Sequence, residues 1–223
     1  SLPKPKTEFA PTYRFWGWAF HYKNEKNCDI MRNWVLNNQQ RIIDKYDPDD
    51  YNHIDDAGTG LGKNTTTARY RLYNLWHETA EIPAFVDFRK RLYDEYCEFM
   101  ETLTYAVKEC TIQGWMNVMG AGEQIKVHHH GTRPESYLSG NLHLDNYPTK
   151  TYYLRPIDKG LWNFTNVKGA CTLFPSQMMH GTDTYNELNG KRVSVAFDIY
   201  VKQFNLIKDV DGLKYPKVDF KVE

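Results

Sequence analysis

The 223-residue sequence has no excess of charge of either sign, because 28 Lys and Arg residues balance 28 Asp and Glu residues. A nucleic-acid-binding surface needs an excess of basic side chains, so nucleic acid is not expected as a partner. No apolar run approaches 18 residues, and neither a transmembrane helix nor a membrane partner is therefore expected. The four cysteines are scattered without a C-x-x-C pair, which argues against a zinc knuckle and a dense disulfide framework.

The sequence also lacks internal repeats, low-complexity tracts and a Pro-rich linker, so we expect a single domain over residues 1–223. The first residues lack the apolar stretch of a signal peptide, which predicts a cytoplasmic protein with reduced cysteines. Hydrophobic residues make up 41% of the chain and charged residues 25%, a globular composition. Nothing in the sequence indicates an oligomeric state.

The N-terminal part, about residues 1–110, is expected to be mixed and mainly helical. Residues 13–22 alternate as in a strand, and Asn27 or Asp29 is expected to cap a helix that ends near Lys45. A loop rich in Asp, Gly and Asn follows over residues 47–64. A longer helix is predicted from Pro83 because apolar residues recur every three or four positions: Phe85, Phe88, Leu92, Tyr96, Phe99, Leu103 and Val107. Its Glu95 is expected on the outside.

The following part, about residues 111–203, has short runs rich in Tyr, Val, Trp and Thr that are broken by Gly, Asn and Pro. This rhythm predicts an antiparallel sandwich or barrel. The expected strands are 112–119, 124–130, 136–143, 149–154, 170–174 and 192–201. The fold class is therefore mainly β with supporting α-helices, a jelly roll. Residues 204–223 form an extension that adds an edge strand or follows the surface.

The segment Gly58–Lys63 is similar to a phosphate-binding loop, but Ala57 and Asn64 replace two of the residues that such a loop requires. A loop without phosphate is the favoured interpretation. This loop and the segment around Arg133 are candidates for substrate contact, because loops at the mouth of a jelly roll carry specificity.

Three consecutive histidines, His128, His129 and His130, carry the strongest chemical signal. On a strand, His128 and His130 share one face and His129 points the other way. Two imidazoles on an inward face can hold a metal ion such as Zn, Fe, Cu or Ni, whereas on an outward face they form a solvated cluster. His180 follows about fifty residues later, after an apolar run and a Pro-Ser turn.

Arg192 and Ser194 share one face of a predicted strand whose other face is apolar. A guanidinium matches a carboxylate with two parallel hydrogen bonds, and a Ser hydroxyl adds a third donor. This pair therefore indicates a carboxylate-binding site.

Five segments in this order resemble the Fe(II)/2-oxoglutarate-dependent oxygenases, and more narrowly a group of such sequences common in phages and marine bacteria. They are Trp115-Met116-Asn117-Val118, His128–His130, Leu138-Ser139-Gly140, Phe174–Gly181 and Arg192–Ser194. The resemblance covers about residues 80–201 and implies a double-stranded β-helix, a cupin-like jelly roll.

The resemblance implies Fe(II) and 2-oxoglutarate as cofactors and His128 and His180 as metal ligands. The third ligand is either His130, which stands where the family has a carboxylate, or Glu135 or Asp145. Arg192 and Ser194 would bind the distal carboxylate of 2-oxoglutarate, and Tyr152 and Tyr153 are further candidates for co-substrate contact. The implied reaction is hydroxylation of an unidentified small molecule or peptide with release of succinate and CO2, in the host cytoplasm if a phage encodes the chain. The alternatives are a cupin-like metal- or ligand-binding module without turnover and a phage accessory protein.

Overall fold

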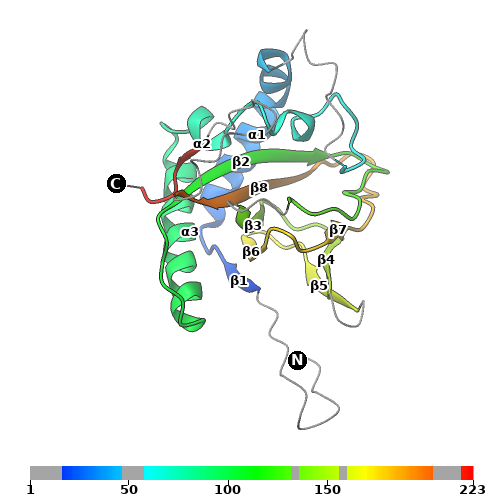
Figure 1. The fold of residues 1–223 in the computed structure, drawn as a ribbon. Coiled ribbons are helices and arrows are strands. Elements are labelled where there is room, and N and C mark those ends of the chain that lie inside the picture. The colour runs from blue at the N-terminus through cyan, green and yellow to red at the C-terminus, as the bar shows by residue number, and fades with distance from the viewer. Residues whose placement is uncertain (1–16, 47–57, 132–135, 156–159, 203–216, 223) are drawn as a thin grey trace.

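The computed structural model describes residues 17–46, 58–131, 136–155, 160–202 and 217–222. The nine strands of the described residues form two sheets, a six-stranded sheet in the order β1-β6-β3-β8-β2-β9 and a three-stranded sheet in the order β5-β4-β7. Every strand pair is antiparallel. Figure 1 shows the helices on one side of the larger sheet, with β4, β5 and β7 on the other side. The predicted mainly β class is confirmed.

The strands are β1 (Trp18–His21), β2 (Cys110–Met119), β3 (Ser136–His143), β4 (Lys150–Leu154), β5 (Leu161–Thr165), β6 (Ala170–Pro175), β7 (His180–Thr182), β8 (Arg192–Val201) and β9 (Val218–Asp219). The helices are α1 (Glu25–Lys45), α2 (Leu75–Glu78) and α3 (Pro83–Thr102), with a 3-10 turn at Thr67–Arg69.

Helix α1 begins earlier than predicted, because its cap is Asn24 rather than Asn27 or Asp29. The Asn24 side chain accepts a hydrogen bond from the backbone N–H of Asn27, which satisfies one of the free donors of the first turn. The two predicted cap residues lie inside the helix. The predicted strand 13–22 is observed as β1, and its residues before Gly17 lie outside the described residues.

Helix α3 begins at Pro83 as predicted, and most of its apolar stripe is buried. It ends at Thr102, where Thr104 adopts a positive φ of 58°, so Val107 lies beyond the helix and is exposed. The prediction that Glu95 faces solvent is wrong. Glu95 is buried because it accepts a hydrogen bond of 2.7 Å from the indole N–H of Trp18 and pairs with Arg91.

One core joins the helices to the larger sheet. Buried residues of α1, α3, β2, β6 and β8 form a continuous apolar cluster, which includes Met31, Phe88, Ile112, Leu173 and Phe197. Burial of this surface is the main source of stability. The helices thus cover one face of the larger sheet, and its other face is left for the three-stranded sheet and the cavity between them.

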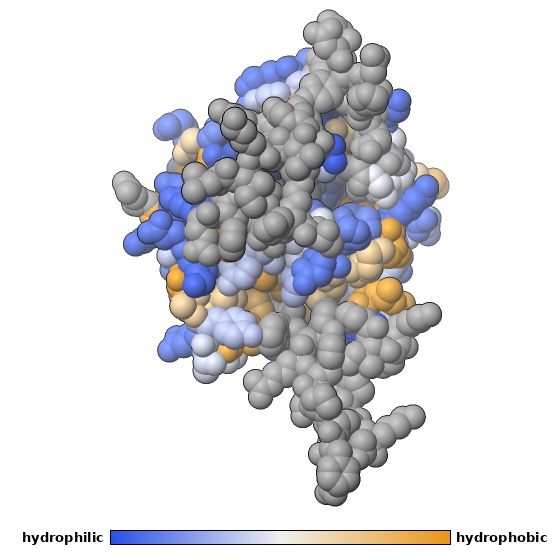
Figure 2. Space-filling view, in the orientation of Figure 1, coloured by the Kyte–Doolittle hydropathy of each residue, from blue (hydrophilic) through white to orange (hydrophobic). Residues whose placement is uncertain are grey.

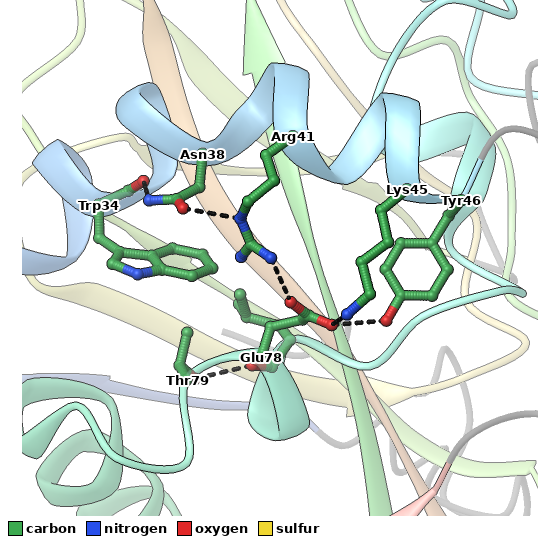
Figure 3. Close-up of polar contacts among 8 residues, drawn as sticks. Trp34, Asn38, Arg41, Lys45, Tyr46, Glu78 and Thr79 are labelled. Atoms are coloured by element: carbon green, nitrogen blue, oxygen red, sulfur yellow. Dashed lines mark hydrogen bonds and ion pairs between the residues drawn. The ribbon is translucent and has the colours of Figure 1, made fainter.

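A polar cluster joins α1 to α2 (Figure 3). The Glu78 carboxylate accepts from Arg41 at 3.0 Å, from Lys45 at 2.6 Å and from the Tyr46 hydroxyl at 2.5 Å. These three donors lower the pKa of Glu78, although burial alone would raise it. The short α2 is therefore held to the C-terminal end of α1 by charge-assisted hydrogen bonds.

One predicted strand is wrong, and two observed strands were not predicted. Residues 124–130 do not form a regular strand; the segment is held by isolated bridges between Glu123 and Tyr185 and between His128 and His180. Strands β5 and β7 were not predicted. The C-terminal extension does contribute an edge strand, because β9 pairs with β2.

All four cysteines are free. No helix in the described part of the chain is both long and apolar enough to cross a bilayer. Small hydrophobic patches lie among hydrophilic residues on the face drawn in Figure 2.

Candidate metal centre

Three imidazoles from two distant segments meet at one point between the sheets. The ligand atoms of His128, His130 and His180 all lie within 4.8 Å of one another. The ring centroids are 4.4 Å apart for His128 and His180, 4.9 Å for His130 and His180, and 5.2 Å for His128 and His130. The expectation that these distant residues come together is confirmed.

Backbone hydrogen bonds hold the two segments in place. His128 and His180 exchange N–H to carbonyl bonds of 3.0 and 2.9 Å, and the N–H of His130 donates to the Ser176 carbonyl at 2.9 Å. Although the segment is not a regular strand, these contacts still place His128 and His130 toward the same point. His129 is exposed and does not belong to the three-residue cluster.

Each of the three rings has an acceptor oxygen beside its Nδ1. His128 Nδ1 lies 2.8 Å from the Lys126 carbonyl and His180 Nδ1 lies 2.9 Å from the Met178 carbonyl. His130 Nδ1 lies 2.6 Å from Asp198 Oδ1. An acceptor at Nδ1 selects the tautomer that carries its proton there, and the lone pair is then on Nε2. All three histidines therefore offer Nε2 as a metal ligand.

Burial keeps two of these rings uncharged. Desolvation, followed by the neighbouring His130, lowers the pKa of His128 to about 4. Desolvation and the two neighbouring imidazoles lower the pKa of His180 well below its usual value. Neutral imidazole nitrogens are the form that binds divalent transition metals, so the donor set fits such an ion.

The structure separates the alternatives for the third ligand. Asp145 forms an ion pair with Arg32 at 3.3 Å and is not part of the three-residue cluster. Glu135 and Arg133 lie outside the described residues. Of the three candidates, His130 is the residue whose ligand atom lies beside those of His128 and His180.

The histidines border an open cavity between the two sheets. Strands β2, β3, β8, β4 and β7 line it, together with the 58–70 and 125–130 segments. Its lining includes Thr59, Tyr70, Trp115, Asn141, His143, Thr151, Arg192, Ser194 and Asp198. Thr59 belongs to the predicted loop 47–64, whose residues before Gly58 lie outside the described residues. The N–H of Lys126 donates to the Thr59 carbonyl at 2.8 Å, which joins this loop to the histidine segment.

Arg192 and Ser194 lie on the cavity face of β8, as the alternation predicts, and Val193 and Val195 lie in the core. Arg192 is only 1% exposed, and its Nε has no hydrogen-bond partner among the described residues. Burial lowers its pKa to about 10, so the side chain remains a cation at neutral pH. A buried cation with unfilled donors is costly unless an anion accompanies it, and the site therefore fits a carboxylate ligand.

The two tyrosines predicted to contact the co-substrate do not line this cavity. The Tyr152 hydroxyl donates to the Thr182 carbonyl at 3.1 Å. The Tyr153 hydroxyl lies 2.6 Å from Thr172 Oγ1 and accepts from Asn141 Nδ2 at 3.1 Å. The Tyr153 ring instead packs beside His180, with 5.9 Å between centroids. From β4, the residue that reaches the cavity is Thr151.

Several polar residues of the cavity were not found from the sequence, among them Asn141, His143 and Asp198. His143 Nδ1 and Asn141 Oδ1 have no partner among the described residues. Burial and the nearby Arg192 lower the pKa of His143 well below its usual value. Strand alternation could have indicated them. Asn141 and His143 share one face of β3, and Asp198 lies on the same face of β8 as Arg192 and Ser194.

No family model and no curated protein matches the sequence. The structure is similar to a prolyl-4-hydroxylase from Pseudomonas putida, with a TM-score of 0.56 and 9% identity over 84% of this chain and 94% of that chain. It is also similar to the viral collagen prolyl hydroxylase from Paramecium bursaria Chlorella virus-1. That match has a TM-score of 0.54 and 11% identity over 90% of this chain and 99% of that chain. At these identities the likeness concerns the fold, and the chain has the double-stranded β-helix architecture of 2-oxoglutarate/Fe(II) oxygenase structures.

Proposed function

We propose that the protein is an Fe(II)- and 2-oxoglutarate-dependent dioxygenase that hydroxylates a small molecule or a peptide and releases succinate and CO2. One observation carries the proposal. Three imidazoles with free Nε2 atoms and the buried guanidinium of Arg192, whose Nε has no hydrogen-bond partner among the described residues, border the same cavity. The first group fits a transition metal and the second fits a carboxylate.

In this proposal His128, His130 and His180 hold the metal. Arg192 and Ser194 bind the distal carboxylate of 2-oxoglutarate, and the cationic Arg192 neutralises it. His143 borders the cavity beside Arg192 and, being uncharged, offers a further hydrogen bond to the co-substrate. When bound, iron and 2-oxoglutarate supply the oxidative chemistry, while the chain supplies orientation and a cavity shielded from water.

The substrate is expected to approach past Thr59 and Tyr70 of the 58–70 segment and past Trp115 of β2, which all border the cavity. The rings of Tyr70 and Trp115 lie 5.4 Å apart, and the rings of Trp115 and His130 lie 5.3 Å apart. This row of aromatic rings leads to the histidines and offers apolar surface to a substrate. Because the two similar structures named above are prolyl hydroxylases, Pro-containing peptides are the first substrates to test.

The test is an anaerobic titration of 2-oxoglutarate into the Fe(II)-loaded protein. We expect a metal-to-ligand absorption band that saturates, and we expect no band with the His180→Ala variant. Succinate release in air, with Pro-containing peptides and with small-molecule substrates, then measures turnover. If iron binds but 2-oxoglutarate produces no band, the protein is a metal-binding module without this reaction.

A further inference from the structure

Asp198 is a buried carboxylate that directly contacts one of the three histidines. It lies on β8 and is 4% exposed. Its Oδ1 lies 2.6 Å from His130 Nδ1 and accepts from the Ser139 hydroxyl at 2.5 Å, while its Oδ2 lies 3.3 Å from the Tyr200 hydroxyl. The Nδ1 atoms of His128 and His180 instead face backbone carbonyls, so His130 alone of the three has a carboxylate partner.

Hydrogen bonds through Ser139 and Ser176 link Asp198, which contacts the His130 ring, to the carbonyl that accepts from the His130 backbone N–H. Ser139 and Asp198 are partners across β3 and β8. Ser139 Oγ also lies 3.0 Å from Ser176 Oγ, and the Ser176 carbonyl accepts from the N–H of His130. The single hydroxyl proton of Ser139 goes to the carboxylate, so Ser176 is the donor to Ser139. His130 is thus fixed at its ring by Asp198 and at its backbone by Ser176.

The surroundings leave the negative charge of Asp198 without a full cationic partner. Among the described residues, the ion pair of Asp198 is with His130. Burying a carboxylate is costly unless hydrogen bonds or a positive charge compensate. A divalent cation bound to His130 Nε2 would supply that charge on the far side of the imidazole ring.

We propose that Asp198 is the positioning residue of the metal centre. Hydrogen-bonded by Ser139, it holds His130 in the tautomer that presents Nε2, and it brings negative charge to an all-histidine site through that ring. Carboxylates that bind the second nitrogen of a ligating histidine raise its basicity, and their loss typically weakens metal binding by about 10- to 100-fold. This inference rests on the proposed function, because it assumes that the three histidines bind a metal.

The test uses Co(II), whose absorption spectrum reports the ligand field without turnover. We expect Asp198→Ala to weaken Co(II) binding by about 10- to 100-fold and to change the visible spectrum. Asp198→Asn keeps the size of the side chain and an acceptor oxygen but removes the charge, so we expect a smaller loss and a shifted spectrum. The matched control is Asp29→Asn, an exposed carboxylate on α1 that pairs with Lys168, which should bind Co(II) as the unmodified protein does.

The outcomes separate this inference from the proposed function. If the unmodified protein does not bind Co(II) or Fe(II), the proposed function itself fails. If the unmodified protein binds Co(II) and both Asp198 variants bind it with unchanged affinity and spectrum, only the role of Asp198 is wrong. Circular dichroism and thermal unfolding of the metal-free proteins identify a variant that does not fold. If Asp198→Ala is unfolded, Asp198→Asn decides the question alone, and wild-type affinity and spectrum in that variant would overturn the role.

Discussion

His128 and His180 are joined by two backbone hydrogen bonds of 3.0 and 2.9 Å, although about fifty residues separate them in the sequence. This pairing sets their imidazole rings 4.4 Å apart without relying on side-chain contacts alone. Because the main chain fixes both positions, the site is preorganised. The protein therefore loses little conformational entropy when a metal ion binds there.

His180 is the most enclosed of the three histidines, so its removal tests the centre most directly. We expect His180→Ala to lose bound iron, because two imidazoles at most remain in place. Its ring packs against Phe174 at 4.7 Å, so a loss of thermal stability is also expected. Metal analysis of the purified variant measures the first effect. His129→Ala, which changes an exposed neighbour, is the control, and full iron occupancy in His180→Ala would remove His180 from the site.

Arg192→Lys keeps the positive charge but loses the planar fork that binds two carboxylate oxygens at once. We expect the affinity for 2-oxoglutarate to fall by about tenfold or more, which corresponds to roughly 1.4 kcal/mol, while the metal content remains unchanged. Anaerobic titration of the Fe(II) protein measures it. Arg41→Lys, on the exposed face of α1, should bind 2-oxoglutarate normally. Unchanged affinity in Arg192→Lys would contradict the assigned role.

Stability of the metal-free protein should fall on acidification. The pKa of His128 is about 4 in the folded protein, against an ordinary value of 6.5, because of burial. Between these values the unfolded chain binds a proton that the folded chain does not, so stability is lost as the pH falls from about 6.5 toward 4. His128 alone accounts for roughly 3 kcal/mol at the low end, and His143 and His180 act in the same direction.

Urea unfolding in the presence of a chelator, at pH 7 and pH 5, measures this effect. A control variant, His77→Gln, changes an exposed histidine and should keep the full pH dependence. Equal unfolding free energies at the two pH values would show that the buried histidines do not remain neutral.

Gly140 has no room for a side chain. A Cβ atom there would lie 2.3 Å from the Thr172 carbonyl oxygen and 2.5 Å from the ring of Phe197. Because a backbone atom cannot move aside easily, we expect Gly140→Ala to destabilise the protein by about 3 kcal/mol. Gly17→Ala is the matched control, since its added Cβ would meet only one atom, at an ordinary 3.7 Å. Thermal unfolding of both variants tests the comparison.

This crowding also gives a physical reason for the glycine in the Leu138-Ser139-Gly140 motif. Leu138 is part of the core, Ser139 binds Asp198, and Gly140 allows β3 to lie close to β6 and β8. The motif thus combines a packing role with support for His130.

Local patterns predicted the elements with a clear periodicity well, and they failed where a residue's environment depends on distant contacts or where the periodicity is weak. The apolar stripe of α3 and the alternation of β8 follow from the geometry of one helix or strand, so both could be predicted from the sequence. The burial of Glu95 could not, because it depends on Trp18, a residue far away in sequence. Strand β5 was missed because its exposed, weakly alternating residues lack the signal of a half-buried strand.

The sequence by itself determined the mainly β class, the histidine and arginine candidates and the face of β8 that carries Arg192 and Ser194. These follow from periodicity and from the chemistry of each side chain. Only the tertiary structure decided that His130 lies with His128 and His180, and that Asp145 pairs with Arg32 instead. It also decided that the hydroxyls of Tyr152 and Tyr153 form hydrogen bonds with Thr182 and Thr172, and that Asp198 contacts His130. These contacts depend on the pairing of β3 with β8 and of the histidine segments with each other. Such long-range pairings produce no periodic pattern in the sequence, so the sequence alone does not predict them.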